Sequence, residues 1–122
     1  MQHFVKATRE GLIGHLTATG HILSEDSEGC ALPCHHALRR WVRITHGDFE
    51  TRCQVLDVGP WNTDDDAYVL GDARPQAETG VDRRGRRTNG AGIDLFEGTW
   101  RALGMTDNDL VTWEFVDAPL ST

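Results

Sequence analysis

Residues 41–60 constrain the fold of this chain more than any other segment. Apolar and polar side chains alternate over residues 41–45 and again over residues 52–57, which is typical of half-buried strands. Residues 46–48 (His-Gly-Asp) lie between these runs and have the composition of a tight turn, so the two strands are predicted to form a hairpin. Pro60 has no backbone N–H to donate to a sheet, and the second strand is therefore expected to end before it.

Other strand patterns are shorter. Residues 13–20 are predicted to form a short strand closed by Gly20, and residues 110–116 a final strand. The polar segment 62–92 is long for a connection inside a compact domain, so we expect a functional or partly disordered insertion loop. Residues 68–70 are expected to add a short strand within it.

One segment has helical periodicity. Apolar side chains recur at i, i+4 and i+7 over residues 95–103, which predicts a short α-helix. Asp94, with Glu97 three residues later, resembles a capping box at its start, and Gly104 suits the position after its end. Strands, one short helix and no internal repeat predict a mainly all-β fold, a small β-barrel, with residues 1–122 as a single domain.

The charge of the chain narrows its partners. The formal net charge is −7 and the pI is about 5.2, which argues against a generic nucleic-acid binder. No apolar run is long enough for a membrane span, and the N-terminal residues do not have the pattern of a signal peptide.

Two short charged runs stand out. The three aspartates at 64–66 lack the spacing of a calcium loop and are expected to be solvated. A basic patch, either solvated or guiding an acidic substrate, is formed by Arg83, Arg84, Arg86 and Arg87.

Three cysteines leave several arrangements open. Cys30-x-x-x-Cys34-His35-His36 contains metal-ligating residue types, but its spacing matches no common zinc motif. A disulfide from Cys53 to Cys30 or Cys34 is an alternative, and free thiols in the core are the simplest arrangement. We expect no metal site and no cofactor.

Two carboxylates end apolar runs beside residues that bend or stop a strand. Asp57 precedes a Gly-Pro turn, and Asp94 follows Ile93. A pair of carboxylates on a rigid frame can perform acid/base chemistry on a glycosidic bond. Asp94 is interpreted as a general acid, as a purely structural N-cap or as a residue that only binds substrate. Asp57 either supports Asp94 or stabilises the turn, and Trp61 either stacks on a sugar ring or packs in the core.

Several motifs in this order resemble the rare-lipoprotein-A-like and expansin-like double-psi β-barrel family. Residues 17–20 (Thr-Ala-Thr-Gly) resemble the early turn of the family, and residues 41–45 resemble its Arg-Val-Arg-Val-Thr strand. Residues 55–60 resemble its Val-x-Asp-x-Gly-Pro motif. Residues 93–95 and 100–104 resemble the start and end of its Ile-Asp-Leu helix segment. The match runs from about residue 11 to 117 and implies a six-stranded double-psi barrel.

The resemblance implies a polysaccharide, most simply a peptidoglycan glycan strand, lying in an open groove across the barrel. It maps the key acid of the family onto Asp94, the second carboxylate onto Asp57 and the family histidine onto His35 or His36. The substrate-binding residues expected around them are Thr19, Trp61, Asn89, Arg86 and Arg87.

Three hypotheses for function follow. The first is a peptidoglycan-cleaving enzyme of the lytic-transglycosylase type. The second is a non-catalytic wall-binding module, as in the expansin branch of the family. The third is a structural component, possible as a homo-oligomer or a larger assembly, that carries the barrel to the wall in a phage tail or secretion machine. All three imply action at the cell wall, in the periplasm or outside the cell, or in a phage particle.

Overall fold

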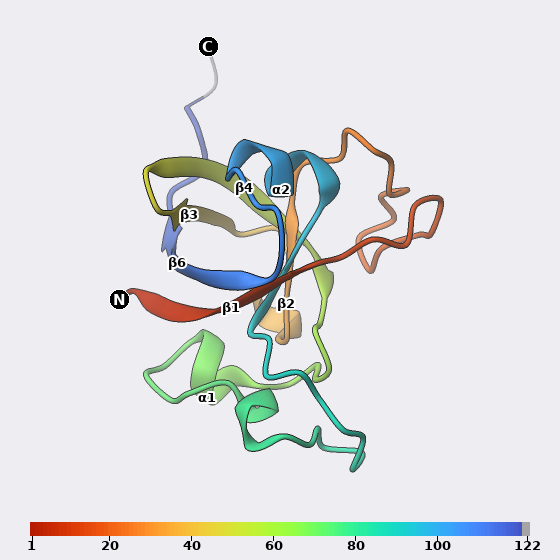
Figure 1. The fold of residues 1–122 in the computed structure, drawn as a ribbon, viewed down its shortest axis with the longest axis vertical. Helices are drawn as coiled ribbons and strands as arrows, with labels where there is room; N and C mark the ends of the chain where they lie inside the picture. The colour runs from red at the N-terminus through yellow and green to blue at the C-terminus, as the bar shows by residue number, and fades with distance from the viewer. Residues whose placement is uncertain (121–122) are drawn as a thin grey trace.

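The computed structural model describes residues 1–120 and contains a closed barrel of six strands (Figure 1). Around the barrel the strand order is β1-β5-β2-β4-β3-β6, and β6 closes the circle by pairing with β1. The pairs β1·β5 and β2·β4 are parallel, whereas the other four are antiparallel. The elements are β1 (His3–Arg9), β2 (Cys30–Leu32), the 3₁₀ turn η1 (His35–Ala37), β3 (Trp41–His46), β4 (Phe49–Val58), α1 (Asp66–Val69), the 3₁₀ turn η2 (Gln76–Thr79), β5 (Ile93–Leu95), α2 (Glu97–Ala102) and β6 (Asp109–Val116).

This architecture confirms the predicted small all-β barrel, including its hairpin and its last strand. β3 and β4 pair in register from Trp41↔Gln54 to His46↔Phe49, with Gly47 in a left-handed conformation at the turn. Inward-facing side chains from all six strands fill the core together with residues of α1 and α2. The largest fully buried side chains include Trp113, Tyr68, Phe96, Ile44 and Leu95.

The first strand of the barrel was not predicted. β1 buries His3, Val5 and Ala7, while Phe4 on the opposite side is 55% exposed. The pattern of a strand is present, but a histidine points inward and a phenylalanine outward, so the apolar alternation is blurred. The strand predicted over residues 13–20 is wrong. Residues 11–29 form a loop with one isolated bridge between Leu16 and Ile22.

Two predictions for the second half of the chain also need correction. Tyr68 and Val69 lie in the single turn α1 rather than in a strand, because the Asp65 carbonyl accepts both of their N–H groups. α2 begins at Glu97, later than predicted, and its N-cap is Phe96, which forms no side-chain cap bond. Asp94 lies in β5, so the capping-box interpretation is wrong.

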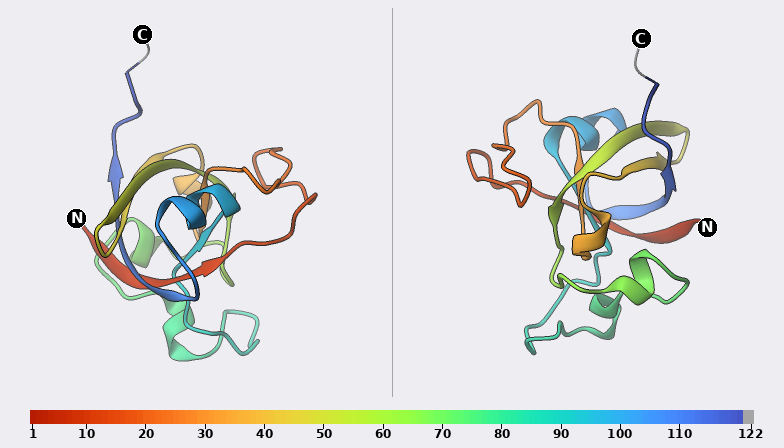
Figure 2. Two further views of the ribbon diagram at one scale, coloured as in Figure 1. Left: turned by 45° about the horizontal axis from the view of Figure 1, so that its top comes forward. Right: turned by 180° about the vertical axis from the view of Figure 1, so that it is seen from behind.

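Two long segments project from the barrel in different directions. The loop between β1 and β2 extends to one side, and residues 59–92 fold below the barrel around α1 and η2 (Figures 1 and 2). Tyr68 fastens the second segment to the core: its hydroxyl accepts a hydrogen bond from Trp113 Nε1 (2.8 Å) and donates one to the carbonyl of Gly92 (2.9 Å). The predicted insertion loop therefore contains helical turns and a buried anchor.

Candidate functional site

Sheet register aligns the two predicted carboxylates. In the pairing of β5 with its neighbours, Asp94 lies opposite Thr8 on one side and opposite Ala31 on the other. Ala31 in turn lies opposite Asp57 of β4. Residues paired in register point to the same face, so Thr8, Asp94, Ala31 and Asp57 form a row across four strands. The small side chain of Ala31 leaves space between the two carboxylates.

Asp94 is held by a residue of the neighbouring strand. Its Oδ1 accepts a hydrogen bond from the buried Thr8 hydroxyl, and Oδ2 lies 4.0 Å from the position that a Cβ on Gly59 would take. Burial raises the pKa of Asp94 to about 6, with the nearby charge of Asp57 adding to the rise and hydrogen bonds from Thr8 and Glu10 opposing it. A carboxyl with this pKa holds a proton in mildly acidic solution, as a general acid requires.

A third carboxyl, Glu10, joins the row and was not predicted. Glu10 follows β1 directly, two residues after Thr8, and its N–H donates to the carbonyl of Leu95 (2.8 Å). Burial raises its pKa to about 9, together with side-chain contact with Asp57 and the charge of Asp94. In the described residues its Oε2 atom is buried without a donor. With this pKa Glu10 is neutral at pH 7, which removes one of three negative charges that would otherwise lie close together.

Asp57 is held by the loop that precedes β2. Its Oδ1 accepts the backbone N–H of Ala18 (3.0 Å). Thr19 lies beside it, but its hydroxyl donates to the carbonyl of Leu56 (2.7 Å) and lies 3.2 Å from the hydroxyl of Thr17. Thr19 therefore fastens the early turn to β4, which places Ala18 over Asp57.

An open groove of about 440 Å³ exposes the Asp94 end of the row. On one wall, Trp61 donates its ring N–H to Asn89 Oδ1 (3.0 Å), which orients the indole. Trp61 itself has a positive φ of 69°. The residues lining the groove are Thr8, Arg9, Pro60, Trp61, Asn89, Asp94 and Asn108.

The predicted arginines lie at the edge of this arrangement. Arg86 donates from Nε to the buried Asp82 (2.6 Å) and from Nη2 to the carbonyl of Trp61 (3.2 Å), so it supports the loop that holds the indole. Its guanidinium lies 6.0 Å from the centre of the Trp61 ring. Arg87 is exposed, and its backbone forms a bridge with Val81.

The predicted histidines belong to a different cluster. His36 Nδ1 lies 3.0 Å from Asp66 Oδ2, and the buried Cys34 thiol donates to Asp66 Oδ1 (3.0 Å). Burial and the bond to Asp66 raise the pKa of Cys34 to about 11. His35 is exposed beside them. Among residues 1–120, Cys34, His36 and Asp66 are the group whose side chains could hold a metal ion.

The structure also shows the state of the three cysteines. Cys30, Cys34 and Cys53 are free and buried within the described chain, so the disulfide alternative is wrong.

The side chains of the three consecutive aspartates, Asp64 to Asp66, point to different partners. Asp64 pairs with Arg83 (3.2 Å), and Asp65 accepts the N–H of Gln76 (2.7 Å), while Asp66 faces Cys34. They therefore do not converge on one cation.

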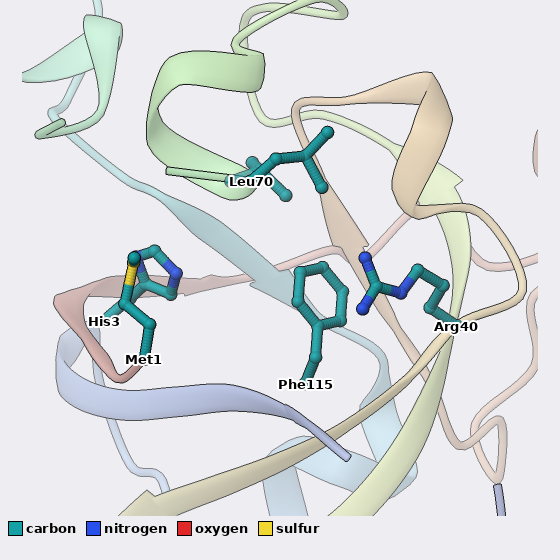
Figure 3. Close-up of a pocket in the computed structure, with 6 residues that line it drawn as sticks. Met1, His3, Arg40, Leu70 and Phe115 are labelled. Atoms are coloured by element: carbon teal, nitrogen blue, oxygen red, sulfur yellow. The ribbon is translucent and has the colours of Figure 1, made fainter. Parts of the chain in front are cut away.

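A second hollow lies toward the other end of β1, away from Thr8. It measures about 270 Å³ and is lined by Met1, His3, Arg40, Val69, Leu70 and Phe115 (Figure 3). Arg40 covers the Phe115 ring at 3.6 Å, and His3 stacks on Trp113. Burial lowers the pKa of His3, with the N-terminal charge and Arg74 adding to the effect. The lining of this hollow is basic and aromatic and includes no carboxylate, so it lacks the acidic groups found in the groove beside Asp94.

Thr8 and Glu10 were not predicted from the sequence. Thr8 lies in β1, and Glu10 is the residue directly after it. The available signal was the recurrence of the apolar residues Val5 and Ala7 at every second position, which predicts a strand whose other face carries Thr8 and then Glu10. Recognising a strand over residues 3–9 would have assigned Thr8 and Glu10 to neighbouring positions on the end of the barrel.

Comparisons with known proteins agree with the fold. The chain belongs to the family described as Domain of unknown function (DUF8814), whose model matches residues 1–114. No curated protein matches the sequence. No helix in residues 1–120 is long and apolar enough to cross a membrane.

Three solved structures share the architecture. The Streptomyces papain inhibitor is 15% identical, with a TM-score of 0.57, and the alignment covers 95% of this chain and 94% of the inhibitor. A mutant Clavibacter michiganensis expansin in complex with cellohexaose is 16% identical, with a TM-score of 0.59, over 100% of this chain and 54% of the expansin. The expansin without ligand is 18% identical, with a TM-score of 0.59, over 99% and 53%. This chain thus spans about half of the expansin chains.

Proposed function

We propose that this chain is a module that binds a cell-wall polysaccharide in the groove beside Asp94. The observation that carries the proposal is the convergence of one oriented aromatic ring, Trp61, with the polar groups of Asn89 and Asp94 around a single open hollow. Small-molecule and glycan sites combine an apolar surface with a few fixed polar groups in this way.

The physical fit to a sugar is direct. The apolar face of a pyranose packs on an indole, and the hydrogen bond to Asn89 fixes the plane of the Trp61 ring before a ligand arrives. At the floor of the groove, Asp94 and the oxygen of the Thr8 hydroxyl, whose proton is donated to Asp94, supply acceptors for sugar hydroxyls. The fold similarity supports the same proposal, because the Clavibacter michiganensis expansin was solved with cellohexaose.

Binding is tested by sedimentation with insoluble peptidoglycan and, in parallel, with cellulose. We expect the wild-type chain to sediment with one of them and Trp61→Ala to bind at least about tenfold more weakly, since a lost stacking contact of about 1.4 kcal/mol has that effect. Phe4→Ala is the matched control, because Phe4 is a half-exposed aromatic on β1 that does not line the groove. Equal sedimentation of the two variants, or none by the wild type, would rule out this proposal.

A second candidate is cleavage of the glycan by a lytic-transglycosylase reaction. The observation that favours it is the raised pKa of Asp94, about 6, which burial produces. Protonated Asp94 would donate its proton to the glycosidic oxygen as the C1–O bond breaks. The resulting carboxylate would accept the proton of the sugar C6 hydroxyl as that oxygen bonds to C1, leaving an anhydro end without water. Asp57 and the neutral Glu10 would set the charge around Asp94.

Mass spectrometry of purified sacculi after incubation with the chain separates the two candidates. Cleavage predicts anhydro-ended muropeptides, more at pH 5 than at pH 8 because Asp94 loses its proton as the pH rises through about 6. Asp94→Asn is expected to lower product release by about 10²-fold or more. Sedimentation without any new ends would leave the binding module alone. An action at the cell wall follows from either candidate, whereas a phage-tail or secretion-machine role remains without a specific observation in its favour.

A further inference from the structure

We propose that Cys34, His36 and Asp66 form a binding site for a single divalent ion of the zinc type. The three side chains come from two segments that are separated by about thirty residues in the sequence, and they share no residue with the Asp94 groove. No metal was expected from the sequence, because the spacing of Cys30, Cys34, His35 and His36 matches no common zinc motif. The fold of residues 59–92 adds Asp66 to Cys34 and His36.

The donor atoms already converge. One atom each from the thiol, the imidazole and the carboxylate all lie within 4.8 Å of one another. The carboxylate of Asp66 lies between the other two, with Oδ1 3.0 Å from Cys34 Sγ and Oδ2 3.0 Å from His36 Nδ1. Ligands on a tetrahedral zinc ion are separated by roughly 3.3–3.8 Å, given bonds of about 2.0–2.3 Å. Small side-chain rotations are therefore enough to admit the ion.

The backbone holds the two ligand-bearing segments together without the ion. Cys34 and Asp64 form an isolated antiparallel bridge. The N–H of His35 donates to the carbonyl of Thr63 (3.2 Å), and the N–H of Asp65 donates to the carbonyl of Pro33 (2.8 Å). These bonds flank the ligands on both segments, so the site requires little ordering when an ion binds.

The donor set selects the class of ion. A thiolate, an imidazole and a single carboxylate suit zinc and its substitute cobalt, whereas magnesium and calcium need more oxygen ligands. Three protein ligands leave one position open for water on the exposed side, where His36 lies. Binding displaces the proton of the Cys34 thiol into solution, and the thiolate and carboxylate then balance the two charges of the ion.

The ion would link the turn after β2 with the first residue of α1. Cys34 is buried and leads into η1, while Asp66 begins α1. A bond through the metal would thus fasten residues 59–92 to the barrel at a second point, in addition to the buried hydroxyl of Tyr68.

Titration of the reduced, metal-free chain with Co²⁺ tests the site. We expect one equivalent to bind with the near-ultraviolet absorption of a thiolate bound to cobalt, and Zn²⁺ to displace it. His36→Ala and Asp66→Asn are each expected to weaken Co²⁺ binding at least about tenfold. Cys34→Ser is expected to abolish the thiolate absorption while its circular dichroism spectrum stays that of the wild type.

Matched controls keep the result specific. His15→Ala removes an exposed histidine of the β1–β2 loop, and Asp72→Asn an exposed aspartate of the insertion; neither should change Co²⁺ binding. The buried thiols of Cys30 and Cys53 remain in every variant. Absence of the thiolate absorption in the wild type would overturn the proposal. So would retention of full affinity in both His36→Ala and Asp66→Asn, a measurement that does not depend on how well Cys34→Ser folds.

Discussion

The carboxyl row on the barrel and the insertion below it are held by different kinds of interaction. Thr8, Asp94 and Asp57 are fixed by the register of four paired strands, and their side chains share a partly buried environment. Residues 59–92 contain only two short helical turns, and polar side chains bonded to nearby backbone groups hold much of their shape. Asp82, for example, accepts the N–H groups of both Arg84 and Arg86.

This difference decides what each region can do. A sheet can impose an unfavourable arrangement, such as three carboxyls in contact, because the rest of the barrel maintains the register. In the insertion, Asp65 and Asp82 instead accept backbone N–H groups, and Asp82 also accepts the side chain of Arg86. We therefore expect shifted acid/base chemistry on the barrel and ligand-dependent ordering in the insertion.

The largest expected effect tests whether the two regions fold together. Tyr68→Ala removes a fully buried ring from α1 that reaches Trp113 in the barrel, and it should lower the free energy of unfolding by about 3–5 kcal/mol. Tyr68→Phe keeps the ring but leaves Trp113 Nε1 and the carbonyl of Gly92 without their partner, which should cost about 1–3 kcal/mol. Urea unfolding followed by tryptophan fluorescence measures both.

One cooperative transition in both variants is expected if Tyr68 joins the regions. Two separate transitions, or a wild-type midpoint in Tyr68→Ala, would show that the insertion contributes nothing to the barrel. Leu70→Ala is a suitable control, because Leu70 follows α1 but is 44% exposed and should change the stability little.

The second expected effect tests the strain in the carboxyl row. Folded Glu10 has a pKa of about 9 against an ordinary 4.5, so the folded chain keeps a proton that the unfolded chain loses between these values. The free energy of unfolding should therefore be highest below pH 4.5, as far as Glu10 determines it, and fall as the pH rises toward 9. Glu10→Gln should remove most of this decline and be about 2 kcal/mol more stable than the wild type at pH 8.

Urea unfolding at a series of pH values from 5 to 9 gives the measurement, and Glu28→Gln on the exposed β1–β2 loop gives the control. A smaller decline that is complete near pH 6 should remain in Glu10→Gln, because Asp94 also binds a proton more tightly when folded, with a pKa of about 6 against an ordinary 3.8. Parallel pH profiles for the wild type and Glu10→Gln would show that Glu10 ionises normally in the folded chain.

The barrel could be predicted from the sequence further than its site could. Alternation over residues 41–45, 52–57 and 110–116 indicates strands directly, and the Gly59-Pro60 turn marks where one ends. These signals are local. Glu10 gives no such signal, because its pKa depends on Asp57 and Asp94, which the barrel brings beside it from other strands.

The errors have the same origin. Phe96 occupies the N-cap of α2 because its buried ring packs against Gly29, where a Cβ would lie only 2.9 Å from it. That contact crosses from α2 to the residue before β2 and overrides the preference for a polar cap. Because Phe96 is the N-cap, Asp94 lies before the helix, in β5, and its carboxyl lines the groove. His36 likewise lies beside Asp66 because Cys34 and Asp64 form a bridge. No local pattern in the sequence indicates that bridge.

The smallest expected effect on the barrel comes from Asp82, at the centre of the arginine turn. Its buried carboxylate is desolvated, but bonds to the backbone and side chain of Arg86 and to the N–H of Arg84 outweigh this cost and lower its pKa. Asp82→Asn weakens these bonds and should loosen the turn without changing the unfolding midpoint of the barrel appreciably. Trypsin, which cleaves after arginine, should then cut at Arg83 or Arg84 faster than in the wild type, as resolved by mass spectrometry of the fragments. Asp72→Asn should leave the rate unchanged.

Since Arg86 also bonds to the carbonyl of Trp61, the loosened variant should bind glycan more weakly than the wild type while Asp94 keeps its pKa. An unchanged cleavage rate together with a lower unfolding midpoint would mean that the insertion is held as rigidly as the barrel, and the contrast between the two regions would then be wrong.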